Sequence, residues 1–122
     1  MQHSKPYSEQ VKLVRLIIGM SGASGAIYGV RLLQVLQNES SIETHLIMSD
    51  SAKLNIAVET EFSSKDVQAL ADQVHSNKDI GATIASGSFR SDGMVIAPCS
   101  IKTLSAVANC YADSLLVRAA DV

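Results

Sequence analysis

The sequence has no tryptophan, and aromatic residues of all kinds make up only 4% of its 122 residues. Hydrophobic residues nevertheless account for 47% and charged residues for 18%, which is the composition of a globular protein rather than of a disordered one. The core must therefore be aliphatic, built from Val, Ile, Leu, Ala and Met. Such a core favours parallel strands that are covered by helices on both faces.

Other absences narrow the function. There is no basic stripe and the net charge is -2, which argues against nucleic acid as a partner. No apolar run reaches the roughly 18–20 residues that cross a bilayer, and no signal-peptide pattern opens the chain, so we expect a cytoplasmic protein with no membrane span. Cys99 and Cys110 have neither metal-ligand spacing nor a disulfide framework. We expect reduced thiols, with Cys99 buried rather than nucleophilic.

Short aliphatic runs alternate with amphipathic segments along the chain. The runs are typical of buried strands and the segments of helices. We expect strands at 12–19, 42–48 and 94–97, and helices at 24–37, 51–60, 65–74, 101–108 and 114–122. The polar stretch 75–90 is predicted to be a loop with a short extended piece at 82–85. This alternation predicts βαβ units and an α/β fold with a parallel sheet.

The ends of the chain carry two further expectations. Residues 1–11 are polar and are expected to form a flexible lead before a single domain over 12–122. The last predicted helix has no stop signal, and a sheet of only the predicted strands would leave an open edge. We therefore expect a chain that continues past Val122 or that relies on neighbouring subunits.

The carboxyl ends of the predicted strands are the expected ligand site, because open α/β sheets bind ligands there. These ends carry Gly19–Gly25, Ser49–Ser51 and Pro98–Ser100. Each brings a small hydroxyl residue to the start of a helix, with Ser49 or Asp50 and then Ser100 as the expected caps. Free N–H groups at helix starts attract anions, so the three ends together predict an anion site.

The Gly19–Gly25 turn is the sharpest signal. Gly22 and Gly25 permit close backbone approach and positive φ, and Ser21 and Ser24 can donate hydroxyls to phosphate oxygens. The turn is neither G-x-G-x-x-G nor a P-loop. The second strand ends in Ser49, with no acid where a dinucleotide ribose is usually held, and Asp50, the nearest candidate, is expected to be a helix cap. A mononucleotide is therefore favoured, and the alternative is a plain tight turn with helix caps.

The remaining candidates are weaker on the residues alone. Glu59 is either a solvated surface acid or a functional one, and Ser86–Ser88 is either an anion-holding loop or merely a flexible one. His3, His45 and His75 form no cluster in the sequence. No metal site is predicted.

Several motifs, taken together and in order, resemble those of UbiX-type flavin prenyltransferases, long labelled aromatic-acid or 3-octaprenyl-4-hydroxybenzoate decarboxylases. The resemblance runs from about Val14 to Val122. It is carried by GMSGASGAIYG (19–29), SGSF (86–89), PCSIKTL (98–104) and RAADV (118–122).

The resemblance implies a flavodoxin-like Rossmann sandwich of three layers, assembled into trimers and dodecamers with flavin mononucleotide (FMN) at subunit interfaces. It implies transfer of a dimethylallyl group from dimethylallyl phosphate to reduced FMN, at flavin N5 and then C6. The prenylated FMN would serve a partner UbiD-type decarboxylase in ubiquinone biosynthesis. The chain has no aspartate-rich metal motif, so an allylic phosphate would leave with help from hydrogen bonds and basic groups.

The resemblance also assigns roles to residues. Ser24 and Glu59 match residues that act near flavin N5 and in proton transfer, which raises Glu59 to a credible candidate. Ser86, Gly87 and Ser88 match the loop near the prenyl phosphate. The residues that match flavin contacts are Gly22, Ala23, Ser24, Ser49, Ser100, Ile101, Lys102 and Thr103. The family's later arginine, tyrosine and basic residues would fall beyond Val122.

Two other functions stay open at this stage. A flavin-dependent cysteine decarboxylase would need a catalytic histidine near the second helix, where this chain has Asn55 and Glu59 instead. A non-catalytic flavin-binding module would retain flavin without turnover.

Overall fold

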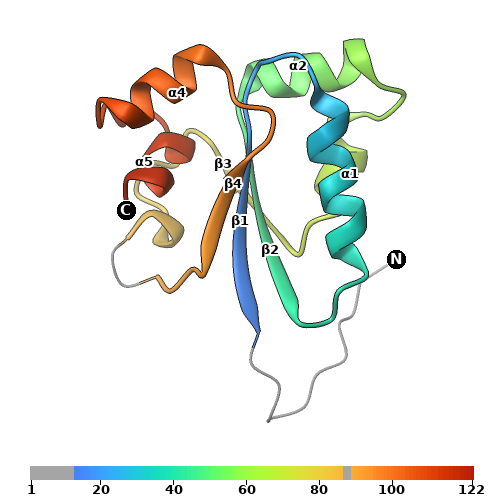
Figure 1. Cartoon of the computed structure of the whole chain (residues 1–122), viewed down its shortest axis with the longest axis horizontal. Helices are drawn as coiled ribbons and strands as arrows, with labels where there is room; N and C mark the ends of the chain where they lie inside the picture. Colours follow the sequence, from blue (N-terminus) through green and yellow to red (C-terminus); the bar gives the residue numbers. More distant parts are fainter. Residues whose placement is uncertain (1–12, 87–88) are drawn as a thin grey trace.

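The protein folds as a parallel sheet between two layers of helices, which confirms the predicted α/β sandwich (Figure 1). The computed structural model describes residues 13–86 and 89–122. Its strands are β1 (Val14–Met20), β2 (Ile42–Met48), β3 (Gln73–Ser76) and β4 (Gly93–Ile96), in the spatial order β3-β2-β1-β4. All three strand pairings are parallel.

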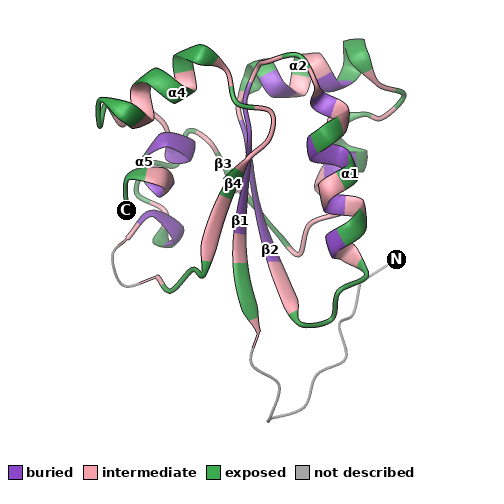
Figure 2. Cartoon of the chain, in the orientation of Figure 1, coloured by how far each residue is buried: buried purple, intermediate pink, exposed green. Residues whose placement is uncertain are grey.

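Successive side chains of β1 and β2 point to opposite faces of the sheet, so the core has two halves, one on each face. Ile18 and Leu46 face the layer of α1 (Ala26–Gln37), α2 (Asp50–Glu59) and α3 (Ser64–Gln68). Ile17 and Ile47 face the other layer, which contains η1 (Thr83–Ala85), α4 (Ile101–Ala108) and α5 (Leu115–Asp121). Figure 2 shows the buried residues gathered on the strands and on the inward sides of α1 and α5.

The predicted strands and most predicted helices are present, and Ser49 and Ser100 are caps as expected. Ser49, Ser63, Ser100 and Ser114 each accept a hydrogen bond from a backbone N–H of the helix that follows. The first helix begins at Ala26 rather than at residue 24. Gly25 precedes it with φ of 102°, a left-handed conformation that a residue with a side chain rarely adopts.

The segment after α2 departs from the prediction. The expected helix over 65–74 ends at Gln68, and Gln73–Ser76 is instead the edge strand β3, so the sheet has a fourth strand. Asp72 directs this change because its Oδ2 accepts hydrogen bonds from Thr44 N (2.8 Å) and Thr44 Oγ1 (3.3 Å). The predicted extended piece at 82–85 is also wrong, since Thr83–Ala85 forms a turn of 3-10 helix.

Candidate functional site at the carboxyl ends of the strands

The turn after β1 is held to the loop after β4 by Ser21. This side chain is buried, and its Oγ donates to Pro98 O (3.0 Å) and accepts from Ser100 N (2.6 Å). The Ala97–Pro98 peptide bond in that loop is cis. The Ser21 hydroxyl is therefore occupied within the protein and is not the phosphate donor that the sequence suggested, whereas Ser24 is exposed.

Helix α2 packs against the other side of the same turn. A Cβ on Gly22 would lie 2.3 Å from Ser51 Cβ, so only glycine fits at this position. Asn55 Nδ2 donates to Ala23 O at 3.3 Å. Glu59, one helical turn later, accepts from Gly25 N and from Ala26 N, both at 3.1 Å to its Oε1.

These contacts explain how α1 begins. Gly25 has no side chain to cap the helix, and the first N–H groups of a helix need outside acceptors. The Glu59 carboxylate supplies one and places a negative charge at the positive end of the helix dipole. Glu59 is thus bound to the turn next to Ser24, and its sequence-based role in proton transfer stays a prediction.

The other two strand ends begin helices in the same way. Ser49 Oγ accepts from Ala52 N at 3.1 Å at the start of α2, and Ser100 Oγ accepts from Thr103 N at 3.1 Å at the start of α4. Ser100 Oγ also donates to Thr103 Oγ1 at 3.0 Å. The remaining N–H groups of these first turns stay available to a ligand.

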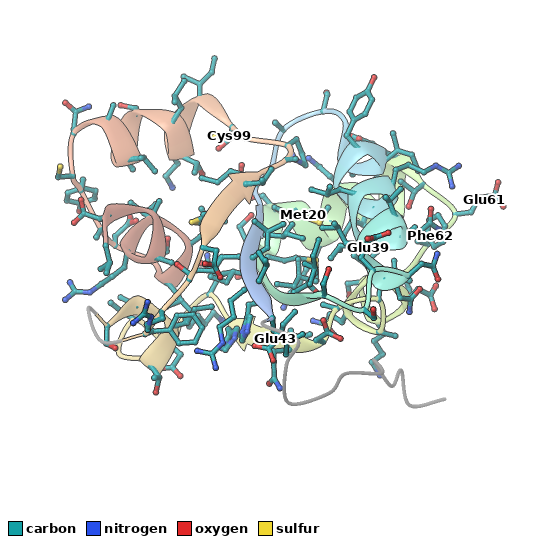
Figure 3. All side chains as sticks on the ribbon, turned by 60° about the horizontal axis from the view of Figure 1, so that its bottom comes forward. Met20, Glu39, Glu43, Glu61, Phe62 and Cys99 are labelled. Atoms are coloured by element: carbon teal, nitrogen blue, oxygen red, sulfur yellow. The ribbon has the colours of Figure 1, made fainter. Side chains whose placement is uncertain are left out.

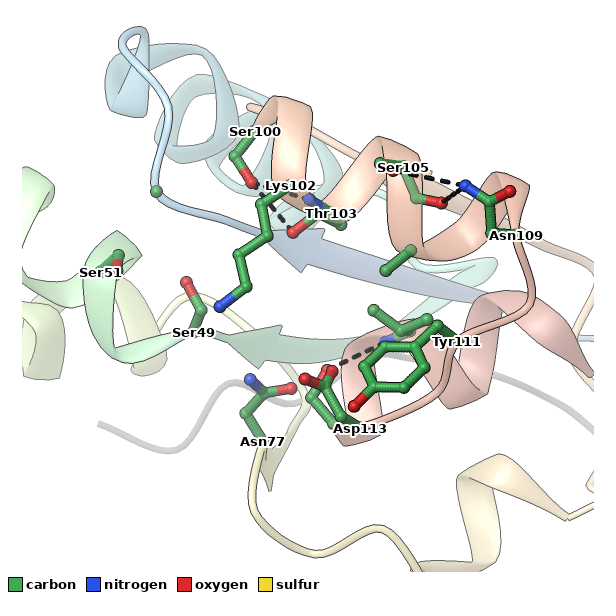
Figure 4. Close-up of a pocket in the computed structure, with 14 residues that line it drawn as sticks. Ser49, Ser51, Asn77, Ser100, Lys102, Thr103, Ser105, Asn109, Tyr111 and Asp113 are labelled. Carbon is green, nitrogen blue, oxygen red and sulfur yellow. Dashed lines mark hydrogen bonds between the residues drawn. The ribbon is translucent and has the colours of Figure 1, made fainter.

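A cavity of about 640 Å³ lies where these ends meet, between α2 and the layer of α4 and α5 (Figure 4). It brings together five of the predicted residues: Gly22, Ser49, Ser100, Lys102 and Thr103. Its other lining residues are Ser51, Asn77, Ser105, Ala106, Asn109, Tyr111, Asp113, Ser114 and Val117. Lys102 and Asp113 are the charged groups among the lining residues.

Other predicted residues lie outside this cavity. Ala23 and Ile101 are next to lining residues but do not line the cavity, and Ser24, two residues after Gly22, does not line it either. Glu59 lines a second hollow of about 990 Å³ beside α1 and α3. Ser86 follows η1, its N–H donates to Thr83 O at 2.9 Å, and it lines neither space. Gly87 and Ser88 lie outside the described residues.

The sequence reasoning missed Asn77 and the connection between α4 and α5. Asn77 directly follows β3, which was predicted as helix and loop, so no strand end was expected there. Tyr111, Asp113 and Ser114 reach the cavity from a segment with no motif of its own. The one sequence signal in this segment is the Asp113-Ser114 pair, because Asp and Ser are common just before a helix begins.

Cys99 and the histidines also differ from expectation. Cys99 is exposed at the carboxyl end of β4, not buried. His45 Nδ1 and His75 Nε2 lie 3.0 Å apart, and His45 Nε2 lies 2.8 Å from Glu43 Oε1, so these two histidines do form a cluster in space. Figure 3 shows Glu43 and Cys99 far apart on the molecule, which places this cluster away from the cavity.

The histidine cluster continues to neighbouring strands and loops. Arg15 Nε lies 3.3 Å from Glu43 Oε1, and the Phe89 ring meets His45 edge-on with centroids 5.3 Å apart. Burial and the neighbouring His45 lower the pKa of His75, while Asp79 acts in the opposite direction. No group of three or more His, Cys, Asp or Glu side chains suited to a metal ion occurs in the described part of the chain.

Comparison with known proteins decides the family. The Flavoprotein family matches residues 4–122, nearly the whole chain. The chain belongs to this family. The flavin prenyltransferase UbiX of Escherichia coli (strain K12) is 63% identical over 108 residues, which are 88% of this chain and 57% of that protein.

Solved structures of flavoproteins agree with this family assignment. AnUbiX, crystallised with FMN and dimethylallyl pyrophosphate, is 44% identical with a TM-score of 0.87, over 90% of this chain and 58% of that one. A dodecameric FMN-dependent UbiX-like decarboxylase from Escherichia coli O157:H7 is 55% identical, with a TM-score of 0.87 over 88% of this chain and 58% of that one. The resemblance to UbiX-type proteins is thereby confirmed. The chain spans somewhat over half the length of these relatives.

The geometry of this flavoprotein suits a nucleotide. The volume of the cavity falls in the usual range for small-molecule sites, about 300–1,000 Å³. Its wall combines serine and threonine hydroxyls, a lysine and the first turns of two helices, which are the groups that hold phosphate.

No described helix combines the length and the apolar character that crossing a bilayer requires.

Proposed function

We propose that this chain is the flavin-binding part of a flavin prenyltransferase, which transfers a dimethylallyl group from dimethylallyl phosphate to reduced FMN. The observation that carries the proposal is the cavity formed where β1, β2 and β4 end, because the residues there that match the UbiX flavin contacts come from three separate motifs. The 63% identity to a UbiX protein supports the same reaction.

The chain's own residues would hold FMN in defined ways. Lys102 offers a cation, and Ser49, Ser100 and Thr103 offer hydroxyls and the N–H groups of two helix starts. In this proposal the Gly22–Ser24 backbone contacts the flavin, since Gly22 lines the cavity and Ser24 is exposed two residues later. The bound flavin would supply the electron-rich ring that accepts the prenyl group.

Ser24 and Glu59 are the proposed catalytic residues. Glu59 Oε1 accepts from Gly25 N, the amide next to Ser24, so the carboxylate is bound to the turn that carries the Ser24 hydroxyl. In this proposal the Ser24 hydroxyl holds a proton near the reacting edge of the flavin, and the Glu59 carboxylate exchanges that proton with it. Positioning by these residues and by the α1 start keeps the reacting groups aligned.

The prenyl phosphate is proposed to contact the loop 86–88. Ser86 does not line the cavity of its own chain, and in this proposal the loop of a neighbouring subunit supplies the contact. Trimers assembled into dodecamers, with FMN at the subunit interfaces, are the oligomer that we propose. The dodecameric state of one similar structure supports this arrangement.

The product is proposed to leave for a UbiD-type decarboxylase in ubiquinone biosynthesis. The proposed location is the cytoplasm. The two cysteines are free, as expected in a reducing compartment.

A mass measurement tests the reaction. The full-length protein is mixed with reduced FMN and dimethylallyl phosphate, and the released flavin is examined by mass spectrometry. We expect flavin that is heavier by one prenyl unit. Flavin of unchanged mass would overturn the transferase, and stoichiometric retention of that flavin would favour a non-catalytic binding module. Carbon dioxide released from a peptide cysteine would favour the decarboxylase, against which the absence of a histidine from α2 argues.

A further inference from the structure

Asn77 is a wall residue of the cavity that none of the flavin-binding motifs contains. Its side-chain Oδ1 accepts a hydrogen bond from Leu116 N at 2.8 Å, and its backbone oxygen accepts one from Leu115 N at 2.9 Å. The first of these bonds fixes which end of the Asn77 amide is the oxygen, because the Leu116 N–H must donate to an oxygen and not to the amide nitrogen. The Nδ2 group therefore points away from α5, and within the described ranges it has no hydrogen-bond partner.

The free Nδ2 group lies on the side of the cavity that carries the positive charge. In Figure 4 the amide nitrogen of Asn77 is on the side of Ser49 and of the Lys102 amine, and the amide oxygen is on the side of Asp113. Ser49 Oγ already accepts from Ala52 N, so its own hydrogen is free to donate. Donors from the end of β3, the start of α2 and α4 thus face one space.

An acceptor for these three donors must be rich in oxygen and negatively charged. A phosphate has several acceptor oxygens and matches a lysine, whereas a ring carbonyl is neutral and accepts from only one or two donors. We propose that Asn77 Nδ2 donates a hydrogen bond to the phosphate of the bound flavin nucleotide, beside Lys102. This proposal rests on the proposed function and adds to the site a residue that directly follows a strand without a motif.

The two roles of Asn77 can be separated by substitution. Asn77→Asp keeps an oxygen that accepts from Leu116 N, but it replaces the free donor by a carboxylate oxygen. Asn109→Asp is the matched control, because Asn109 lines the same cavity but already donates its Nδ2 to Ser105 O at 2.8 Å. Both variants add the same charge, and only the first removes a free donor.

The test compares the affinities of FMN and riboflavin, which lacks the phosphate, by fluorescence titration of the full-length protein. We expect Asn77→Asp to weaken the binding of FMN by about tenfold or more and the binding of riboflavin by less than about twofold. The reason is that a hydrogen bond to a charged group is worth roughly 1.5–3 kcal/mol. Asn109→Asp should change the ratio of the two affinities by less than about twofold. Partial unfolding lowers both affinities equally and leaves the ratio unchanged.

Each other outcome is decisive. An unchanged ratio in Asn77→Asp, or an equal change in both variants, overturns the role of Asn77 while FMN binding by the unaltered protein upholds the flavin site. If Asn77→Asp does not fold, the ratio is read from Asn77→Ala, with the same expectation. An unaltered protein that binds neither flavin overturns the proposed function and this inference with it.

Discussion

At the residue scale, Glu59 serves the fold and the proposed site with one carboxylate. It stands at the last position of α2, yet it closes the N-terminus of α1 through Gly25 N and Ala26 N. A sequence can show that an acid lies late in a helix. It cannot show which other helix start the acid reaches, because that depends on how the two helices pack.

Removing this carboxylate should destabilise the protein. We expect Glu59→Ala to lower the free energy of unfolding by about 1 kcal/mol, the usual cost of losing a helix cap, as measured by urea denaturation. Glu59→Gln keeps an acceptor oxygen and should cost less. Glu61→Ala is the control, since the Glu61 side chain is exposed and no hydrogen bond of its carboxylate is seen among the described residues; an equal loss in both alanine variants would refute the capping role.

His75 should make stability depend on pH. Its pKa in the folded protein is lowered below the ordinary value of 6.5, chiefly by burial. Below about pH 6.5 the unfolded chain binds a proton that the folded protein accepts only at a lower pH, so stability falls as the pH decreases through this interval. Thermal unfolding between pH 7.5 and 5.5 should therefore show a falling midpoint, and His75→Gln should reduce the slope. A variant with the original slope would contradict this assignment.

At the element scale, the predictable parts are those whose local pattern agrees with their environment. The apolar runs of β1 and β2, such as Ile17–Ile18 and Leu46–Met48, are buried between the two helical layers, and Ser49 and Ser100 were recognisable as caps. β3 was missed because it is a short edge strand of polar residues, placed by the bonds between Asp72 and Thr44. Asn77 was missed with it, since a strand end must be known before its neighbour can be assigned to a site.

Gly29, inside α1, reverses the usual rule for helices. Alanine is normally better than glycine in a helix interior by about 1 kcal/mol. Here a Cβ would lie 2.4 Å from Ala97 O and 2.7 Å from Met20 Cε, so the helix could not stay close to the sheet. We expect Gly29→Ala to destabilise the protein by about 1–3 kcal/mol in urea denaturation.

Gly81→Ala is the control for this substitution, because nothing lies within 4 Å of a Cβ at that position. It should change stability by less than about 0.5 kcal/mol. A Gly29→Ala protein as stable as the original would show that α1 can move away from the Ala97 carbonyl without cost.

At the scale of the whole molecule, α4 is the least covered of the helices that the structure describes. Figure 2 shows α4 without a buried stretch, and none of its residues is buried. Ile101 and Leu104 are 85% and 60% exposed. Apolar side chains gathered on a short helix at the rim of a site are typical of an interface between subunits. Other residues of the same helix, Lys102 and Thr103 among them, line the cavity, so assembly and ligand binding would share one helix.

Changing that face should alter the oligomer. We expect Leu104→Asp to reduce the particle mass found by size-exclusion chromatography with light scattering, because a charge would be buried in the interface. Val35 is 64% exposed on α1, on the other side of the sheet, and Val35→Asp serves as the comparison. Dissociation by Val35→Asp but not by Leu104→Asp would place the interface on the α1 side.

The bonds from Asn77 to α5 have a consequence for how the molecule opens. A helix of seven residues does not persist alone in water, and α5 has its first two amides held by the residue that follows β3. The edge strand and this helix should therefore detach together, as one cooperative unit. In hydrogen exchange, the amides of Leu115 and Leu116 would then share the opening free energy of β3 rather than fray separately.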